Sequence, residues 1–275
     1  MKICAWSLIL ASVWAPAFAS AQEECGLIPV GTGSIQACSL GTGSVTIILA
    51  AGAGQTSRTW DTLLSRLTPS ARVVTFDRPG LGESLPGQSP RTPTQIAREL
   101  RDVVEALAQS GPHVLVGHSM GGVHVLRYAT LFPDEVAGVV ILETPPPNFE
   151  QLRFGLLTPD EQFERERVLR DGAARAPEVV RLEREGAQVP SEWDFTAFPD
   201  DLPLTVIVAD SQDFGELGSL VAHRQLWLDG SHQWLGLSSR SYLSIADGSG
   251  HMVHHERPEL VVEHILSMVA ALKEW

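Results

Sequence analysis

The segment 114–122, Val-Leu-Val-Gly-His-Ser-Met-Gly-Gly, constrains the fold more than any other stretch of the chain. Its apolar start is typical of a buried strand, and apolar positions recur at helical spacing over 123–129. Between them stands Gly117-x-Ser119-x-Gly121, the pattern of a sharp strand-to-helix turn that lifts its serine above a sheet edge. A Cβ at either glycine would collide with a neighbouring strand or helix, so we expect both glycines to be required.

Other strand-like runs alternate with helix-like segments along the chain. Continuous apolar runs, which predict strands, lie at 45–49, 72–76, 136–142, 204–208 and 242–245. Helical spacing marks 92–108, 223–237 and 258–272. This alternation predicts an α/β fold with a mostly parallel sheet and helices on both of its faces. Ligands of such folds gather at the carboxyl ends of the strands.

The composition narrows the classes of partner. The 275-residue chain is 44% hydrophobic, which suits one domain with a sizeable core. Acidic residues number 33 against 20 basic ones, and the formal net charge is −13. No basic cluster interrupts this acidity, so the sequence disfavours nucleic acid and anionic membrane surfaces as partners. The oligomeric state stays open.

The first 21 residues are typical of a cleaved secretory signal. Lys2 precedes a short apolar run at 3–13, and small residues lead to a cleavage site near Ala21. The run is too short for a good membrane span, so we predict no stable membrane anchor. The mature domain is then expected to cover 22–275 and to be periplasmic or secreted.

The segment that follows is rich in Gly, Ser and Thr over 25–43, which predicts a short hairpin at the edge of the sheet. Cys25 and Cys38 are the two cysteines left once the signal is removed. In an oxidising compartment such a pair is expected to form a disulfide, the alternative being two free thiols.

Residues 148–201 differ in character from the rest of the chain. Two charge-dense segments with helical character lie at 161–170 and 178–185. An insertion of this size is expected to form a helical lid over the site, the alternative being a solvated excursion without substrate contact. We predict that Phe154, Trp193 and Phe195 face the substrate, because a charge-dense insertion has little other use for aromatic side chains.

A serine hydroxyl is a weak nucleophile, so it needs a base within hydrogen-bond reach and a carboxylate that orients this base. His251 follows the last predicted strand between flexible residues, at the same sheet edge as Ser119. We therefore predict that His251 is the base and that the remaining histidines are structural or exposed.

The sequence indicates neither a metal nor a bound cofactor. The glycine-rich loop at 50–55 lacks a Gly-Lys-Ser/Thr sequence and does not have G-x-G-x-x-G spacing, so a nucleotide site is disfavoured. His251, His254 and His255 have no acidic or cysteine partner at the spacing of a metal site.

From Val45 onward the chain resembles the α/β-hydrolase-fold serine hydrolases. The motifs that carry this resemblance lie at 52–54, 76–84, 117–122, 132–136, 249–251 and 256–259. The resemblance implies an oxyanion hole formed by the backbone N–H groups of Ala53 and Met120. The chain departs from the family's pattern at one place. The family commonly has His-Gly where this chain has Ala51-Gly52, and that histidine usually braces the loop.

Two carboxylates compete for the role of triad acid. Glu143 ends the strand that follows Ser119, and Asp213 lies at the tip of the 204–208 strand. Both keep the order serine, acid, histidine. Most relatives by resemblance place the acid at the position of Asp213, but Asp210 stands where their tip has glycine. We favour Glu143, because a buried strand that ends in a glutamate needs a partner for that charge.

These observations predict a secreted or periplasmic serine hydrolase that cleaves a small carboxylic ester or lactone through an acyl-enzyme. Two alternatives remain at this point. The same scaffold also performs carbon–carbon bond hydrolysis and cofactor-free perhydrolysis, by resemblance. A non-catalytic protein that binds a small ligand is the other alternative.

Overall fold

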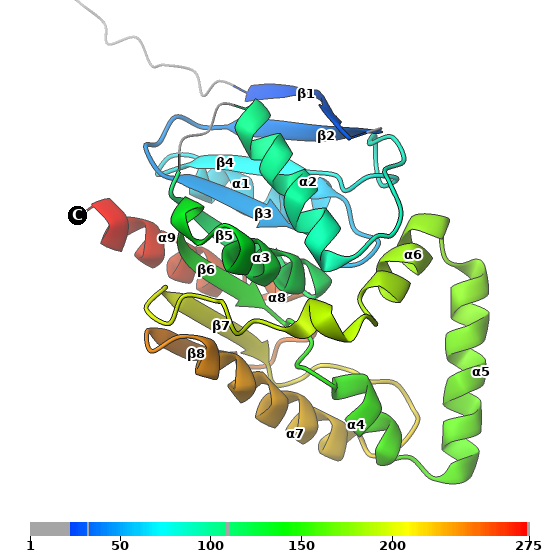
Figure 1. Cartoon of the computed structure of the whole chain (residues 1–275). Coiled ribbons are helices and arrows are strands. Elements are labelled where there is room, and N and C mark those ends of the chain that lie inside the picture. The colour runs from blue at the N-terminus through cyan, green and yellow to red at the C-terminus, as the bar shows by residue number, and fades with distance from the viewer. Residues whose placement is uncertain (1–22, 32, 108–110, 274–275) are drawn as a thin grey trace, which may run out of the picture.

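The computed structural model describes residues 23–31, 33–107 and 111–273. The predicted signal segment lies outside these residues. The eight strands of the described part form one sheet in the order β1-β2-β4-β3-β5-β6-β7-β8 (Figure 1). The strands are β1 Glu23–Val30, β2 Gly33–Leu40, β3 Thr46–Ala50, β4 Arg72–Phe76, β5 His113–His118, β6 Val136–Leu142, β7 Leu204–Ala209 and β8 Ser241–Ala246.

The pairing of the strands is mostly parallel. β1 and β2 pair antiparallel, as do β2 and β4, and every other neighbouring pair is parallel. The carboxyl ends of β3 to β8 therefore meet at one edge of the sheet. The predicted α/β fold class is confirmed.

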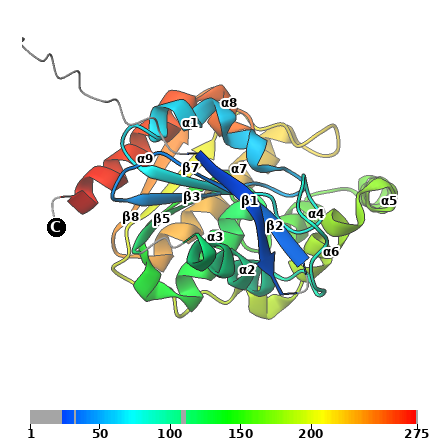
Figure 2. The same cartoon turned by 90° about the horizontal axis from the view of Figure 1, so that it is seen from above.

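Helices cover both faces of this sheet (Figures 1 and 2). The α-helices are α1 Asp61–Leu67, α2 Pro93–Ala106, α3 Met120–Leu131, α4 Phe149–Gly155, α5 Pro159–Arg175, α6 Glu178–Gly186, α7 Leu220–Ser231, α8 Val253–Glu256 and α9 Pro258–Lys273. The 3-10 helices are η1 Ser57–Trp60, η2 Pro133–Glu135, η3 Pro190–Trp193 and η4 His232–Leu237. One apolar core joins the sheet to α2, α3 and α7, and a second joins its other face to α1 and α9. No helix in the described ranges is long and apolar enough to cross a membrane.

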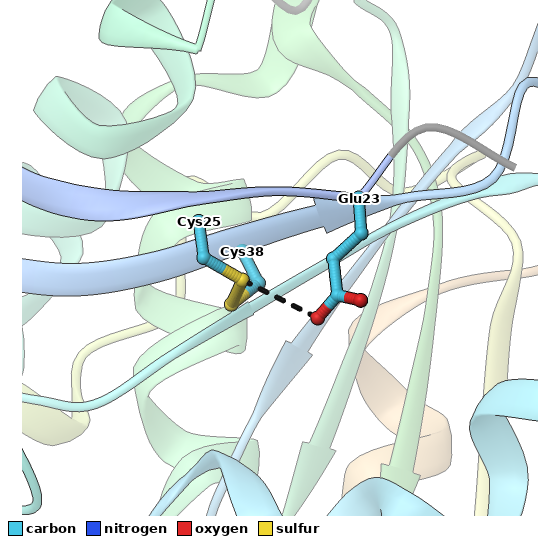
Figure 3. The surroundings of a disulfide bond; sticks show 3 residues. All are labelled: Glu23, Cys25 and Cys38. Carbon is cyan, nitrogen blue, oxygen red and sulfur yellow. Dashed lines mark hydrogen bonds between the residues drawn. A yellow bond between two sulfur atoms is a disulfide. The ribbon is translucent and has the colours of Figure 1, made fainter.

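The N-terminal hairpin extends the sheet at its antiparallel edge. Cys25 and Cys38 are direct partners in the β1–β2 register and form a disulfide, which confirms the predicted pairing (Figure 3). The predicted edge hairpin is also confirmed, with Gly31 in the turn at a φ of 56°. The disulfide thus ties the terminal strand to β2, which pairs in turn with β4.

The insertion, residues 148–201, lies between β6 and β7 and contains α4, α5, α6 and η3. Helix α5 stands away from the sheet and α6 returns to the body (Figure 1). None of the side chains of α5 is buried, whereas α6 buries Val180, Glu183 and Gly186. Helix α5 begins before the predicted segment because Thr158 and Glu161 form a capping box at its start.

Candidate active site

Ser119 occupies a strained turn between β5 and α3. Its φ is 52° and its ψ is −124°, a conformation that is rare for a residue with a side chain. A Cβ on Gly117 would lie 2.4 Å from the carbonyl oxygen of Gly121, and a Cβ on Gly121 would lie 2.2 Å from that of Ala50. The predicted need for both glycines is therefore confirmed, with the neighbouring helix and strand as the obstacles.

Glu143 follows β6 beside this turn. The backbone N–H of Ser119 donates to the carbonyl oxygen of Leu142, so the turn that contains Ser119 is tied to the strand end that carries Glu143. The Nδ1 atom of His251 lies 3.4 Å from Oε2 of Glu143. The structure thus brings Glu143 and His251 together at the carboxyl edge of the sheet.

Asp213 lies elsewhere in its loop. It is exposed, and its Oδ1 accepts a hydrogen bond from the N–H of Gly215 at 2.8 Å. Asp210 accepts hydrogen bonds from the Ser211 hydroxyl and from the N–H of Gly248. Of the two predicted candidates for the acid, Glu143 is the one whose carboxylate contacts His251.

The Glu143 carboxylate is fully buried and well coordinated. Its Oε1 accepts hydrogen bonds from the N–H of Ala209 at 2.6 Å and from Nε1 of Trp227 at 3.0 Å. Burial raises the pKa of Glu143 above its usual range, while the hydrogen bonds from His251, Ala209 and Trp227 act in the opposite direction. The sequence analysis did not find Trp227, because nothing in the pattern of a helix marks one apolar residue as a donor to a distant carboxylate.

His118 holds the backbone that carries His251. Its Nε2 donates to the carbonyl oxygen of His251 at 2.9 Å, and the two rings lie 4.8 Å apart between centroids. Burial lowers the pKa of His118 to about 3, and burial likewise lowers that of His254 to about 2. Both rings are therefore neutral near pH 7, and the contact of His118 orients the loop of the predicted base.

The two predicted oxyanion donors belong to the start of α3 and to the loop after β3. Met120 is the first residue of α3, so its N–H has no acceptor within the helix. Ala53 belongs to the loop after β3, and a Cβ on the preceding Gly52 would lie 3.2 Å from the Cβ of Ser119. This loop therefore passes directly beside Ser119.

Arg78 braces the loop in which the family's usual histidine is missing. Its guanidinium is buried and donates to the carbonyl oxygens of Ala51 and Gly52 at 2.6 and 2.8 Å. Arg78 belongs to a motif that the sequence analysis used for the resemblance, but no role was assigned to it. The charged pair Asp77-Arg78 directly after a buried strand was the signal available.

The three residues of the insertion that we predicted to face the substrate do not share one environment. Trp193 stacks on Trp234 at 6.4 Å between ring centroids, and Phe195 meets the same indole edge-on at 5.7 Å. These aromatic side chains line a pocket of about 470 Å³ whose lining includes neither Ser119 nor His251. Phe154 is half-buried on α4.

The imidazoles of His254 and His255 lie within hydrogen-bond distance of Thr59. Nε2 of His254 lies 2.8 Å from the hydroxyl of Thr59, and Nε2 of His255 lies 2.7 Å from the Thr59 carbonyl oxygen. Among the described residues, one group has the spacing of metal ligands, namely Glu23, Cys25 and Cys38. The two sulfurs of that group are joined in the disulfide and so are not thiolates.

The comparisons with known proteins agree with this architecture. "Uncharacterized protein YqjL" from Bacillus subtilis is 27% identical over 225 residues, which are 80% of this chain and 82% of that one. "Esterase Rv0045c" from Mycobacterium tuberculosis is 29% identical over 207 residues, 74% of this chain and 61% of that one. The crystal structure of carboxylesterase CesB from Bacillus subtilis superposes with a TM-score of 0.64 at 16% identity, covering 91% of this chain and 92% of that one. The model of the alpha/beta hydrolase family matches residues 47–264, and the chain therefore belongs to that family.

Proposed function

We propose that this protein is a serine hydrolase that cleaves a small carboxylic ester or lactone through an acyl-enzyme. One observation carries the proposal: a serine in a strained strand-to-helix turn is tied to the strand end that carries a fully buried carboxylate, and this carboxylate contacts an imidazole. The printed names of the esterase from Mycobacterium tuberculosis and of the carboxylesterase CesB support ester bonds as the substrate class.

In the proposed reaction Ser119 Oγ attacks the carbonyl carbon while Nε2 of His251 takes the hydroxyl proton. Glu143 accepts the Nδ1–H of His251, which fixes the tautomer and stabilises the imidazolium. The negative charge that forms on the carbonyl oxygen accepts hydrogen bonds from the N–H groups of Met120 and Ala53.

Collapse of this tetrahedral intermediate breaks the ester bond, and the departing alcohol oxygen takes the proton from His251. Water then adds to the acyl carbon of the Ser119 ester with His251 as base. Breakdown of the second intermediate releases the acid and returns the proton to Ser119.

We assign the acid role to Glu143 rather than to Asp213. The support is the 3.4 Å contact with His251 and the full burial of the carboxylate, which leaves it no solvent to stabilise its charge. Asp213 is exposed and its carboxylate is engaged by the N–H of Gly215, so it has another function in its loop.

We further propose that the mature protein is periplasmic or secreted. The support is the disulfide between Cys25 and Cys38, because disulfides persist in oxidising compartments.

The experiment compares the wild-type protein with Ser119→Ala on p-nitrophenyl acetate, p-nitrophenyl butyrate and a panel of lactones. We expect Ser119→Ala to lose about three or more powers of ten in kcat, because the remaining rate comes from binding and the oxyanion hole. A phosphonate probe should label Ser119 in the wild-type protein, as read by peptide mass. Ser211→Ala removes another hydroxyl near the sheet edge and serves as the control. If Ser119→Ala keeps a tenth of the wild-type rate, Ser119 is not the nucleophile.

A further inference from the structure

A buried ion pair crosses from the body of the fold to the insertion. Arg78 follows β4, and Glu183 lies on α6. The side chains of Arg78 and Glu183 are 1% and 4% exposed, and they form two hydrogen bonds, Nε to Oε1 at 2.8 Å and one terminal nitrogen to Oε2 at 3.0 Å. We propose that Arg78 is a positioning residue for the oxyanion loop, by which we mean the loop after β3 that contains Ala53, and that Glu183 holds Arg78 in place. The oxyanion hole is then competent only when α6 is docked on the body of the fold. This inference rests on the proposed function.

The orientation of one peptide plane links Arg78 to the chemistry. The carbonyl group of Gly52 and the N–H of Ala53 belong to the same planar trans peptide, so they point in opposite directions. Arg78 donates to the Gly52 carbonyl oxygen at 2.8 Å, and the N–H of Gln55 donates to it at 3.1 Å. These donors fix the carbonyl and thereby fix the direction of the Ala53 N–H, which the proposed mechanism uses. The second bond of Arg78, to the carbonyl oxygen of Ala51, restrains the preceding peptide as well.

Glu183 supplies the charge that the buried guanidinium needs. A buried cation without a carboxylate partner is strongly destabilising, and the two-pronged geometry matches the guanidinium fork. Neighbouring carboxylates are engaged elsewhere. Asp77 accepts from the N–H of Ser57 at 2.7 Å, and Glu99 pairs with Arg91 at 2.6 Å. A body with α6 displaced would therefore leave Arg78 with two carbonyl acceptors and no countercharge.

Helix α6 lies directly on the loop that Arg78 holds. A Cβ on Gly54 would lie 3.3 Å from a methyl group of Val180, so the valine covers this loop. At the end of the helix, a Cβ on Gly186 would lie 2.1 Å from the carbonyl oxygen of Arg91, which shows how closely α6 approaches the body. In Figure 1 α6 is the part of the insertion next to the body, whereas α5 stands away from it. Helix α6 and its buried carboxylate thus join the insertion to the oxyanion loop.

The test compares Glu183→Gln with Glu185→Gln. Glutamine keeps the size of the side chain and removes its charge, and Glu185 is an exposed residue of the same helix that pairs with Arg181 at 3.0 Å. We expect Glu183→Gln to lower kcat for p-nitrophenyl butyrate about 10- to 100-fold with KM changed less than about twofold, because the oxyanion forms only in the transition state. Binding of a trifluoromethyl ketone, which forms the oxyanion on Ser119, should weaken by a similar factor. Glu185→Gln should stay within about twofold of wild type in both measurements.

A second measurement does not depend on turnover. Amide hydrogen exchange of the peptide that covers 50–56 should be faster in Glu183→Gln than in the wild-type protein and in Glu185→Gln. In an Arg78→Lys background, Glu183→Gln should have less than about threefold further effect on kcat, because both residues act on the same loop. Unchanged exchange in Glu183→Gln would overturn the inference, as would a loss of kcat that is fully additive in the double variant. If the wild-type protein cleaves no ester, the proposed function fails, while the exchange measurement still decides whether Glu183 holds the loop.

Discussion

Glu143 is the residue at which backbone strain, burial and hydrogen bonding coincide. Its φ is 49°, in the left-handed region, and its side chain is fully buried at the end of β6. A non-glycine residue in this region costs on the order of 1 kcal/mol or more and persists only where surrounding contacts hold it. The bonds from Ala209 and Trp227 to Oε1 are such contacts, and they leave Oε2 for His251.

The first prediction at this scale compares Glu143→Gln with Asp213→Asn. We expect Glu143→Gln to lower kcat by about a thousandfold or more, because the amide no longer selects the correct tautomer of His251. Asp213→Asn should stay within about threefold, since its carboxylate bonds within an exposed loop. Both variants are assayed with p-nitrophenyl butyrate after a circular dichroism check of folding. The assignment of the acid is wrong if Asp213→Asn loses activity while Glu143→Gln keeps most of its rate.

At the scale of single elements, η3 contains Trp193, whose packing explains one aromatic residue of the insertion. Trp193 donates its Nε1–H to the carbonyl oxygen of Ala187 at 2.7 Å and stacks on Trp234, which is 1% exposed and part of the core. This environment gives Trp193 packing partners at the base of the insertion. The predicted contact of Trp193 with the substrate stays a prediction, and the variant below tests it.

Trp193→Ala is therefore expected to act on stability. Loss of the stacked indole and its hydrogen bond should lower the free energy of unfolding by about 2–3 kcal/mol. The ratio of kcat/KM between acetate and octanoate esters should change less than about twofold. Phe163→Ala removes an aromatic ring from α5 that is 69% exposed, and it serves as the control with little effect on either quantity. A changed ester preference with unchanged stability would show that Trp193 contacts the substrate.

The β1–β2 hairpin is a second element whose contribution to stability can be measured separately. It lies at the edge of the sheet, where β2 alone connects it to β4, and the disulfide joins Cys25 directly to Cys38. The crosslink closes a short loop and so restricts the unfolded chain more than the folded one.

The double substitution Cys25→Ser/Cys38→Ser should lower the free energy of unfolding by about 2–3 kcal/mol, as measured by urea denaturation. Turnover of esters should be unchanged, because the hairpin is at the far edge of the sheet from β5 and β6. The wild-type protein in dithiothreitol provides the matched control. Alkylation of both wild-type cysteines under denaturing, non-reducing conditions would contradict the disulfide itself.

At the scale of the whole molecule, buried neutral histidines make stability depend on pH. Burial lowers the pKa of His118 to about 3 and that of His254 to about 2. Below about pH 6.5 the unfolded chain binds protons at these two positions, while the folded protein leaves both rings neutral down to these lowered values. The unfolded state therefore gains relative stability as the pH falls. Glu143, with its raised pKa, contributes with the opposite sign.

We expect each of the two histidines to contribute about 1.4 kcal/mol per pH unit to the fall in unfolding free energy between about pH 5.5 and pH 4. His254→Gln should make this dependence shallower by about that amount. His232→Gln removes an exposed imidazole and is the control. The measurement is urea denaturation at a series of pH values. Parallel dependences in His254→Gln and the wild-type protein would exclude His254 as a source of the linkage.

The sequence by itself determined the α/β class, the order of most strands and helices, and the sharp turn that carries Ser119. These features follow from local information, because the periodicity of apolar residues reflects one element and the face it buries. Gly117 and Gly121 belong to this group, since the collisions that exclude a Cβ arise from the turn itself and from the strand beside it. The short helices α1 and α8 were missed, because seven and four residues contain too little periodicity to indicate a helix.

Only the tertiary structure decided which carboxylate contacts His251 and what braces the loop after β3. Glu143 directly follows β6 and Asp213 lies in the loop after β7, so the sequence places both at the carboxyl edge of the sheet and allows either to reach His251. Arg78 and Glu183 are 105 residues apart, and no local pattern relates them. Such contacts depend on how the loops at the strand ends and the helices of the insertion pack together. They are long-range properties of the folded chain, and the periodicity of its segments does not encode them.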